Sequence, residues 1–139
     1  MSGGWRIALA QVDPLVGDVE GNLERVSEAG RRGRDAGARL VVLPEMVLAG
    51  YPPEDLLFHS GLRRRIERAL AALPALADGV GFVVGFPEYD GDKIRNAAAV
   101  FDGGREVARY RKWLLPNYAV FDEKRYFETG DVPSTFEIE

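Results

Sequence analysis

The sequence predicts an α/β domain built on a mixed β-sheet. A strand–helix–strand pattern fills residues 5–43 and predicts two parallel strands joined by a helix. The apolar run at 40–43 (LVVL) predicts that the second of these strands is buried on both faces. Two glycines at 103–104 separate later strand patterns and predict a β-hairpin. A hairpin beside parallel strands makes the sheet mixed.

The N-terminal third alternates strand and helix patterns. Residues 5–12 (WRIALAQV) predict a buried first strand, which Asp13–Pro14 ends. A helix is predicted over 18–36, with Asp18 as its N-cap and Gly37 suited to its C-terminal cap. The apolar face of this helix recurs at spacings of three and four and comprises Val19, Leu23, Val26 and Gly30.

The remaining elements are predicted from the same periodicities and turn signals. They are a strand at 39–43, a short helix at 54–57, a helix through 62–73, and strands at 79–86, 94–101 and 106–110. The segment 87–92 (PEYDGD) predicts a turn-rich loop, and Asp102-Gly103-Gly104 predicts the hairpin turn.

Composition excludes several classes of function. The chain has 139 residues, 46% hydrophobic and 29% charged, which is typical of one soluble globular domain. Its net charge of −4 gives no electrostatic case for nucleic acid or an anionic membrane. No apolar stretch is long enough to span a bilayer and no signal peptide is recognisable, so a cytoplasmic location is expected. With no cysteine, the chain has no disulfide, thiolate metal site or cysteine nucleophile. The single histidine, His59, is expected at the surface near a helix start.

The stretch 40–57 organises the chain. Pro44 cannot donate to a sheet ladder, so the strand should end there and leave Glu45 at its carboxyl end. Open α/β sheets bind their ligands at that end of the strands. The apolar flank at 46–48 favours partial desolvation of Glu45, which suits a general base. A solvated loop carboxylate is the alternative.

A second segment, 110–127, repeats this pattern. Lys112 ends a predicted strand, so it can reach the same rim of the sheet as Glu45. A carboxylate beside an ammonium keeps the ammonium charged, and a fixed cation can stabilise an oxyanion. An isolated lysine at such a place is otherwise a surface residue. The aromatic residues that follow fit either a core or a small pocket, and spacing alone does not choose between them. These are Tyr118, Phe121, Tyr126 and Phe127.

Both segments resemble the catalytic segments of one known family. Residues 43–45 (LPE) with 50–57 (GYPPEDLL), and 112–127 with LPNY and VFDEKRYF, are similar to the nitrilase or carbon–nitrogen hydrolase superfamily. The longer strings resemble the form found in glutaminase domains of glutamine-dependent NAD(+) synthetases. The resemblance implies that residues 1–139 are the N-terminal part of such a domain, a partial α-β-β-α sandwich with no synthetase domain.

The resemblance also implies residue roles. Glu45 would be the general base and Lys112 the cation that stabilises the tetrahedral intermediate. Glu123 would be the second glutamate of the site, and Tyr51 and Tyr118 would help to form the glutamine pocket. Gly130 and the residues after it resemble the family's turn toward a next strand, which implies a last strand at 135–138. No metal site is implied. The family's nucleophile is a cysteine on a later strand, so we expect that the chain stops before it and is inactive alone.

The implied function is hydrolysis of glutamine to release ammonia. The ammonia would amidate nicotinate adenine dinucleotide to NAD in a synthetase domain that uses ATP and Mg²⁺, while the glutaminase part needs no cofactor. The expected partners are glutamine, the rest of the same chain and further copies in a homo-oligomer. Two alternatives remain open, namely a carbon–nitrogen hydrolase acting on a different amide or nitrile, and a non-catalytic binding module that lacks the nucleophile.

Overall fold

The structure, a computed structural model, describes residues 4–130 and 132–138 and contains one five-stranded sheet. The strands follow one another across the sheet in chain order: β1 (Ile7–Leu9), β2 (Leu40–Val42), β3 (Gly81–Asp90), β4 (Lys93–Asp102) and β5 (Arg105–Arg111). The first three are parallel, and β4 and β5 are antiparallel to their neighbours. The predicted α/β class and mixed sheet are therefore confirmed, as is the hairpin at 103–104.

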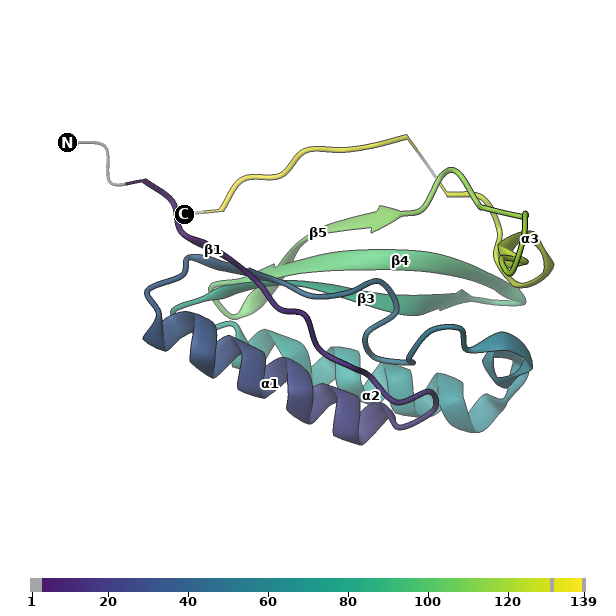
Figure 1. Cartoon of the computed structure of the whole chain (residues 1–139), viewed down its shortest axis with the longest axis horizontal. Coiled ribbons are helices and arrows are strands. Elements are labelled where there is room, and N and C mark those ends of the chain that lie inside the picture. Colours follow the sequence, from purple (N-terminus) through teal and green to yellow (C-terminus); the bar gives the residue numbers. More distant parts are fainter. Residues whose placement is uncertain (1–3, 131, 139) are drawn as a thin grey trace.

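The two long helices, α1 (Val19–Asp35) and α2 (Ser60–Leu76), lie on one face of the sheet (Figure 1). The 3₁₀ turn η1 (Glu54–Phe58) precedes α2, and the short α3 (Glu123–Tyr126) lies apart from the two long helices, beyond the end of β5. The carboxylate of Asp18 caps α1 by accepting a hydrogen bond of 3.1 Å from the Gly21 amide. Gly37 follows the last turn with φ of +72°, a left-handed conformation that favours glycine. Helices in the described ranges are all too short or too polar to cross a membrane.

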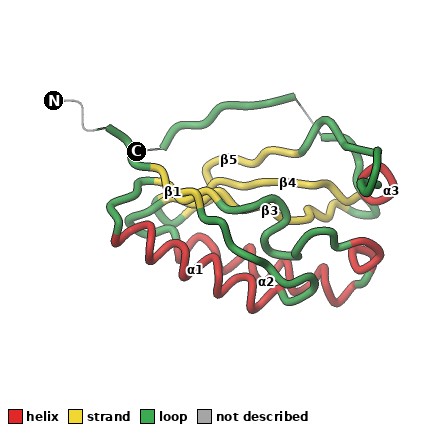
Figure 2. The backbone as a smooth tube through the Cα atoms, in the orientation of Figure 1, coloured by secondary structure: helices red, strands yellow, loops and turns green. Residues whose placement is uncertain are grey.

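Figure 2 shows the long helices and the sheet as two layers, and the buried apolar side chains of the core come from both. Phe82, Val84 and Phe86 alternate along β3 and are fully buried. Gly30 of α1 lets the helix approach the sheet closely, because a Cβ atom there would lie 2.3 Å from the Phe82 ring. Close helix–sheet packing of this kind fixes the position of β3, the strand against which the site is built.

The opposite face of the sheet is only partly covered. The C-terminal segment 132–138 runs above that face (Figure 1), and Pro133 and Phe136 line a small hollow with Val83 and Ala108. On β1, however, Ile7 is 51% and Leu9 is 76% exposed. The prediction of a buried first strand over 5–12 is wrong, because β1 is three residues long and nothing in the described ranges packs over its outer side chains.

Two further boundaries differ from the predictions. Residues 87–90, predicted as loop, continue β3, and Pro87 lies opposite Asn96 of β4. The proline is tolerated because β2 pairs with β3 only over residues 81–83, so at Pro87 the strand has a ladder partner on one side. The segment 132–138 has no regular strand, so the strand predicted at 135–138 is not present.

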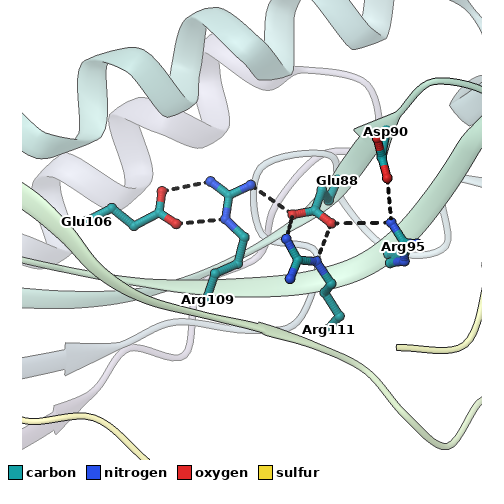
Figure 3. A network of polar contacts seen from close by, with 6 residues as sticks. All are labelled: Glu88, Asp90, Arg95, Glu106, Arg109 and Arg111. Atoms are coloured by element: carbon teal, nitrogen blue, oxygen red, sulfur yellow. Dashed lines mark hydrogen bonds and ion pairs between the residues drawn. The ribbon is translucent and has the colours of Figure 1, made fainter. Parts of the chain in front are cut away.

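A network of charged side chains occupies the helix-side face of the sheet near β5 (Figure 3). At its centre Glu88 of β3 is buried and accepts hydrogen bonds from Arg109 and Arg111 of β5, with Arg95 of β4 3.8 Å away. Glu106 pairs in turn with Arg109 at 2.7 Å. Burial raises the pKa of Glu88, but the Arg111 and Arg109 hydrogen bonds outweigh burial and hold it below its usual value.

We expect Glu88→Gln to lower the free energy of unfolding at pH 7 by about 3 kcal/mol, because it leaves partly buried arginines without their carboxylate. A depressed pKa in the folded state stabilises the fold above the ordinary pKa of the carboxyl, and this contribution is lost as the pH falls through the folded value. The difference between wild type and variant should therefore shrink below about pH 4.

Urea unfolding at pH 7 and in acid measures this difference, with Glu106→Gln as the control. Glu106 also pairs with Arg109 but is more exposed, so its loss should cost at most about 1 kcal/mol. If both variants lose the same free energy of unfolding, the burial of Glu88 does not explain the strength of its ion pairs.

Candidate active site

The turn after β2 places Glu45. Leu43 donates its amide to Val83 of β3 at 3.0 Å, which keeps the chain on the sheet up to Pro44. The turn then packs directly on Gly85, where a Cβ atom would lie 2.6 Å from the Met46 amide nitrogen and 3.0 Å from the Cα atom of Glu45. A side chain at Gly85 would thus displace the backbone that carries Glu45.

The end of β5 places Lys112. Its amide donates to the Asn96 carbonyl of β4 at 2.8 Å, and its own carbonyl accepts from the Gly130 amide at 2.8 Å. Gly130 must lack a side chain here, because a Cβ atom would lie 2.2 Å from the Arg111 carbonyl oxygen. The backbone of Lys112 is therefore held from both sides, and its side chain lies on the sheet face opposite the helices.

Three charged groups meet at this rim. Lys112 Nζ lies 2.7 Å from Glu45 Oε1 and 3.0 Å from Glu123 Oε2, so one ammonium bridges two carboxylates. Glu45 comes from the turn after β2, and Glu123 is the first residue of α3. Partial burial lowers the pKa of Lys112, but its hydrogen bonds to Glu45 and Glu123 outweigh burial and hold that pKa above its usual value. Lys112 is thus a fixed cation across the neutral pH range.

The two carboxylates differ in exposure. The side chain of Glu45 is 46% exposed, more than its apolar flanks suggested, whereas the side chain of Glu123 is only 3% exposed. Both oxygens of Glu123 accept hydrogen bonds from Lys112. Among the described residues, Glu45 Oε2 accepts none. Glu123 is therefore committed to holding the lysine, and Glu45 keeps one oxygen available for a reactant.

Sequence reasoning missed Asn96. This buried residue of β4 donates from Nδ2 to Glu45 Oε1 and, at 3.1 Å, to Glu123 Oε1. A signal was present, since Asn96 is followed by five apolar residues, 97–101, in a predicted strand. A buried asparagine in such a strand needs hydrogen-bond partners, and these carboxylates supply them.

The two tyrosines lie at different depths. Tyr51, half-buried, has a raised pKa because of burial and the negative charges of Glu123 and Glu45, which places it beside the site. Its ring lies 6.5 Å from that of Phe121, which is in turn 5.7 Å from the ring of Tyr118. Tyr118 is 68% exposed, so in this structure it lies at the edge of the site and does not enclose it.

A pocket of about 680 Å³ opens in front of these groups. Glu45, Asn96 and Lys112 supply its polar wall, and most of the remaining wall is apolar and includes Trp113 and Leu114. A larger hollow of about 1000 Å³ lies between β1 and α1 and shares none of its lining residues with this pocket. The smaller pocket is the better candidate, because its wall holds the bridged Glu45 and Lys112 beside apolar residues, and both come from the two segments that the sequence singled out.

The charged groups suit acid–base chemistry. The described residues contain no group of three histidine, aspartate or glutamate side chains that could hold a metal ion. A carboxylate with one available oxygen can accept a proton, and an ammonium beside it can stabilise an oxyanion. The 139 residues include no cysteine.

Comparison with known proteins gives a consistent result. Residues 6–138 match the family model described as carbon–nitrogen hydrolase. The chain is 48% identical over 124 residues to a glutamine-dependent NAD(+) synthetase of Xanthomonas campestris and 44% identical over 128 residues to one of Thermotoga maritima. These alignments cover 88% and 91% of this chain but only 22% of each relative. The chain therefore spans less than a quarter of the length of these relatives.

Solved structures agree. The glutamine-dependent NAD(+) synthetase of Acinetobacter baumannii superimposes with a TM-score of 0.91 at 37% identity, covering 96% of this chain and 26% of that one. An amidase from Nesterenkonia sp. superimposes with a TM-score of 0.83 at 28% identity and is covered over 49% of its length. One structure of that amidase is described as an acrylamide adduct at the active site cysteine.

Proposed function

We propose, since this chain belongs to the carbon–nitrogen hydrolase family, that it supplies the base and the oxyanion-stabilising lysine of a glutamine-hydrolysing site. The proposed parent protein is a glutamine-dependent NAD(+) synthetase, because the curated relatives from Xanthomonas campestris and Thermotoga maritima and the solved structure from Acinetobacter baumannii carry that name. In that protein the ammonia released from glutamine amidates nicotinate adenine dinucleotide, at a separate synthetase domain that uses ATP and Mg²⁺. We place the reaction in the cytoplasm and in a homo-oligomer.

The observation that carries the proposal is the Lys112 bridge between Glu45 and Glu123. The two carboxylates differ in exposure and in hydrogen bonding, so we assign a different task to each group. Glu45, with Oε2 available, takes the proton of a thiol, and Lys112 neutralises the oxyanion that forms on the substrate. Glu123 orients Lys112 and takes no proton.

The proposed reaction proceeds through a thioester. A cysteine thiol from a segment outside these 139 residues gives its proton to Glu45, and the thiolate attacks the side-chain amide carbon of glutamine. The oxyanion of the tetrahedral intermediate is stabilised by Lys112. The C–N bond breaks and Glu45 returns its proton to the departing nitrogen, which leaves as ammonia. A water molecule then gives a proton to Glu45 and attacks the thioester, which releases glutamate and regenerates the thiol.

The pocket supports a substrate with an apolar stem and a polar head. Tyr51 beside the charged groups and the apolar wall at Trp113 and Leu114 can pack against the methylene carbons of glutamine. The amide then reaches Glu45 and Lys112. Tyr118 contacts substrate in this proposal only if its loop closes over the pocket.

Labelled glutamine tests the proposed function. With the side-chain nitrogen of glutamine labelled, the complete enzyme should transfer the label to the carboxamide of NAD in the presence of ATP and nicotinate adenine dinucleotide, as mass spectrometry would record. Release of ammonia from simple amides or nitriles, with none from glutamine, would instead identify a different carbon–nitrogen hydrolase, such as the Nesterenkonia amidase. No release from any of these substrates would identify a non-catalytic module.

A further inference from the structure

Asn96 contacts every member of the charged cluster. Its carbonyl accepts the Lys112 amide at 2.8 Å, and its side-chain nitrogen donates to both Glu45 and Glu123. Because both partners of the side chain are carboxylates, the amide NH₂ must face them, and each of its two hydrogens serves one carboxylate. Asn96 thus links the turn after β2, the end of β5 and α3.

These contacts determine which oxygen of Glu45 can react. Asn96 Nδ2 and Lys112 Nζ both donate to Oε1 of Glu45. A glutamate side chain that is nearly half exposed otherwise rotates broadly about its last torsion. Two donors on the same oxygen fix the carboxylate plane and leave Oε2 as the oxygen that can accept a proton.

We propose that Asn96 is a positioning residue of the glutamine-hydrolysing site, which holds the Glu45 carboxylate with Oε2 toward the substrate and holds Lys112 against Glu123. The geometry of this proposal comes from the hydrogen bonds of Asn96 to Glu45 and Glu123. Its expected effects on kinetics rest on the proposed function. Asn96 itself does not touch the reacting atoms, and it transfers no proton.

A purely structural role makes a different prediction from a positioning role. If Asn96 only fills a buried position, Asn96→Asp preserves the side-chain volume and should be milder than Asn96→Ala, which leaves a cavity. If Asn96 acts by donating to two carboxylates, Asn96→Asp should be at least as damaging as Asn96→Ala. The aspartate has no hydrogen to donate and places a third negative charge beside Glu45 and Glu123.

We expect both variants of the complete enzyme to lower kcat for glutamine about 100-fold, since a displacement of about 1 Å of a catalytic group has that cost. The KM for glutamine should change little, because Asn96, although it lines the pocket, is only 4% exposed and its side-chain NH₂ is engaged with Glu45 and Glu123. NAD synthesis from free ammonia should stay at the wild-type rate. An aspartate variant that keeps near-wild-type kcat would overturn the proposal.

Asn22→Ala serves as the matched control. Asn22 is also a buried asparagine, which bonds Leu15 and Leu48 and none of the charged cluster. Its loss should lower the melting temperature without separating glutamine-dependent from ammonia-dependent NAD synthesis. If Asn96→Ala gives the same pattern as this control, its role is structural and the proposal fails.

A crystal structure of the complete Asn96→Ala enzyme keeps this test separate from the proposed function. The Glu45 carboxylate should be rotated relative to wild type, or Lys112 Nζ should be displaced by about 1 Å. If the wild-type enzyme does not hydrolyse glutamine, the proposed function is wrong and the structure alone decides the role of Asn96. An unchanged Glu45–Lys112–Glu123 arrangement in the variant would overturn the positioning role whatever the activity.

Discussion

In the complete enzyme, Lys112→Ala is expected to lower glutamine-dependent turnover by about 100-fold or more, while ammonia-dependent turnover stays at the wild-type level. The reason is that Lys112 Nζ bridges Glu45 and Glu123, and that Lys112 lines the pocket beside Glu45. Without it the oxyanion loses its partner, and two carboxylates face each other with Asn96 as their remaining shared donor. Added ammonia bypasses this site altogether.

Two further variants sharpen the test. Lys93→Ala removes an exposed lysine at the start of β4 and should leave both turnovers unchanged. Lys112→Arg keeps the charge but replaces a compact ammonium with a planar guanidinium, so it should recover only part of the lost rate. Equal losses with glutamine and with ammonia after Lys112→Ala would show that the substitution damages the whole protein, and that the lysine has no special part in glutamine hydrolysis.

The position of the site could be predicted from the sequence because strand ends carry it. Pro44 ends β2 and sends Glu45 to the carboxyl rim, and the polar hairpin strand β5 ends directly before Lys112. Because β2 is parallel to β3, and β4 and β5 are antiparallel to their neighbours, the ends of β2 and β5 lie at the same rim of the sheet. These local signals predict that Glu45 and Lys112 reach the same rim within ion-pair distance, and the structure gives the contact as 2.7 Å.

Other parts of the site depend on contacts that no local pattern records. Glu123 lies in a four-residue helix, too short to be set by periodicity, and only the family resemblance pointed to it. Asn96 is visible in the sequence as a polar residue in a strand, but its partners come from segments 51 residues before it and 27 after it. The role of these two residues therefore becomes clear only when the sheet and α3 are placed in space.

The errors in the fold have a common physical origin. The apolar pattern of residues 5–12 shows which side chains avoid water, but it does not show what covers them, and Leu9 remains largely exposed. The turn-forming residues of 87–92 predict a loop, yet Pro87 continues β3, which has lost its β2 neighbour by that point. Both cases depend on which neighbour a strand has on each side, and that is a property of the whole sheet.

These 139 residues alone are expected to release ammonia from glutamine at no more than the background rate. Glu45 and Lys112 can supply a base and an oxyanion partner, but neither replaces a thiolate nucleophile, and the chain has no cysteine. Glu123 cannot serve instead, because it is buried and both of its oxygens accept hydrogen bonds from Lys112. Direct attack by water activated at Glu45 remains chemically available.

Such water attack should still be too slow to detect. Sites stripped of their nucleophile keep about 10³- to 10⁴-fold catalysis over water only where substrate binding and the oxyanion site are intact. Here Lys112 is in place, but Glu45 is nearly half exposed and its pocket opens to solvent in front of Trp113 and Leu114, so the condition of intact substrate binding does not hold. The measurement is ammonia release by the purified 139-residue chain, compared with its Glu45→Ala variant and with buffer. Turnover clearly above buffer that the substitution abolishes would mean that this chain carries a complete hydrolytic site, with a water molecule in place of the thiolate.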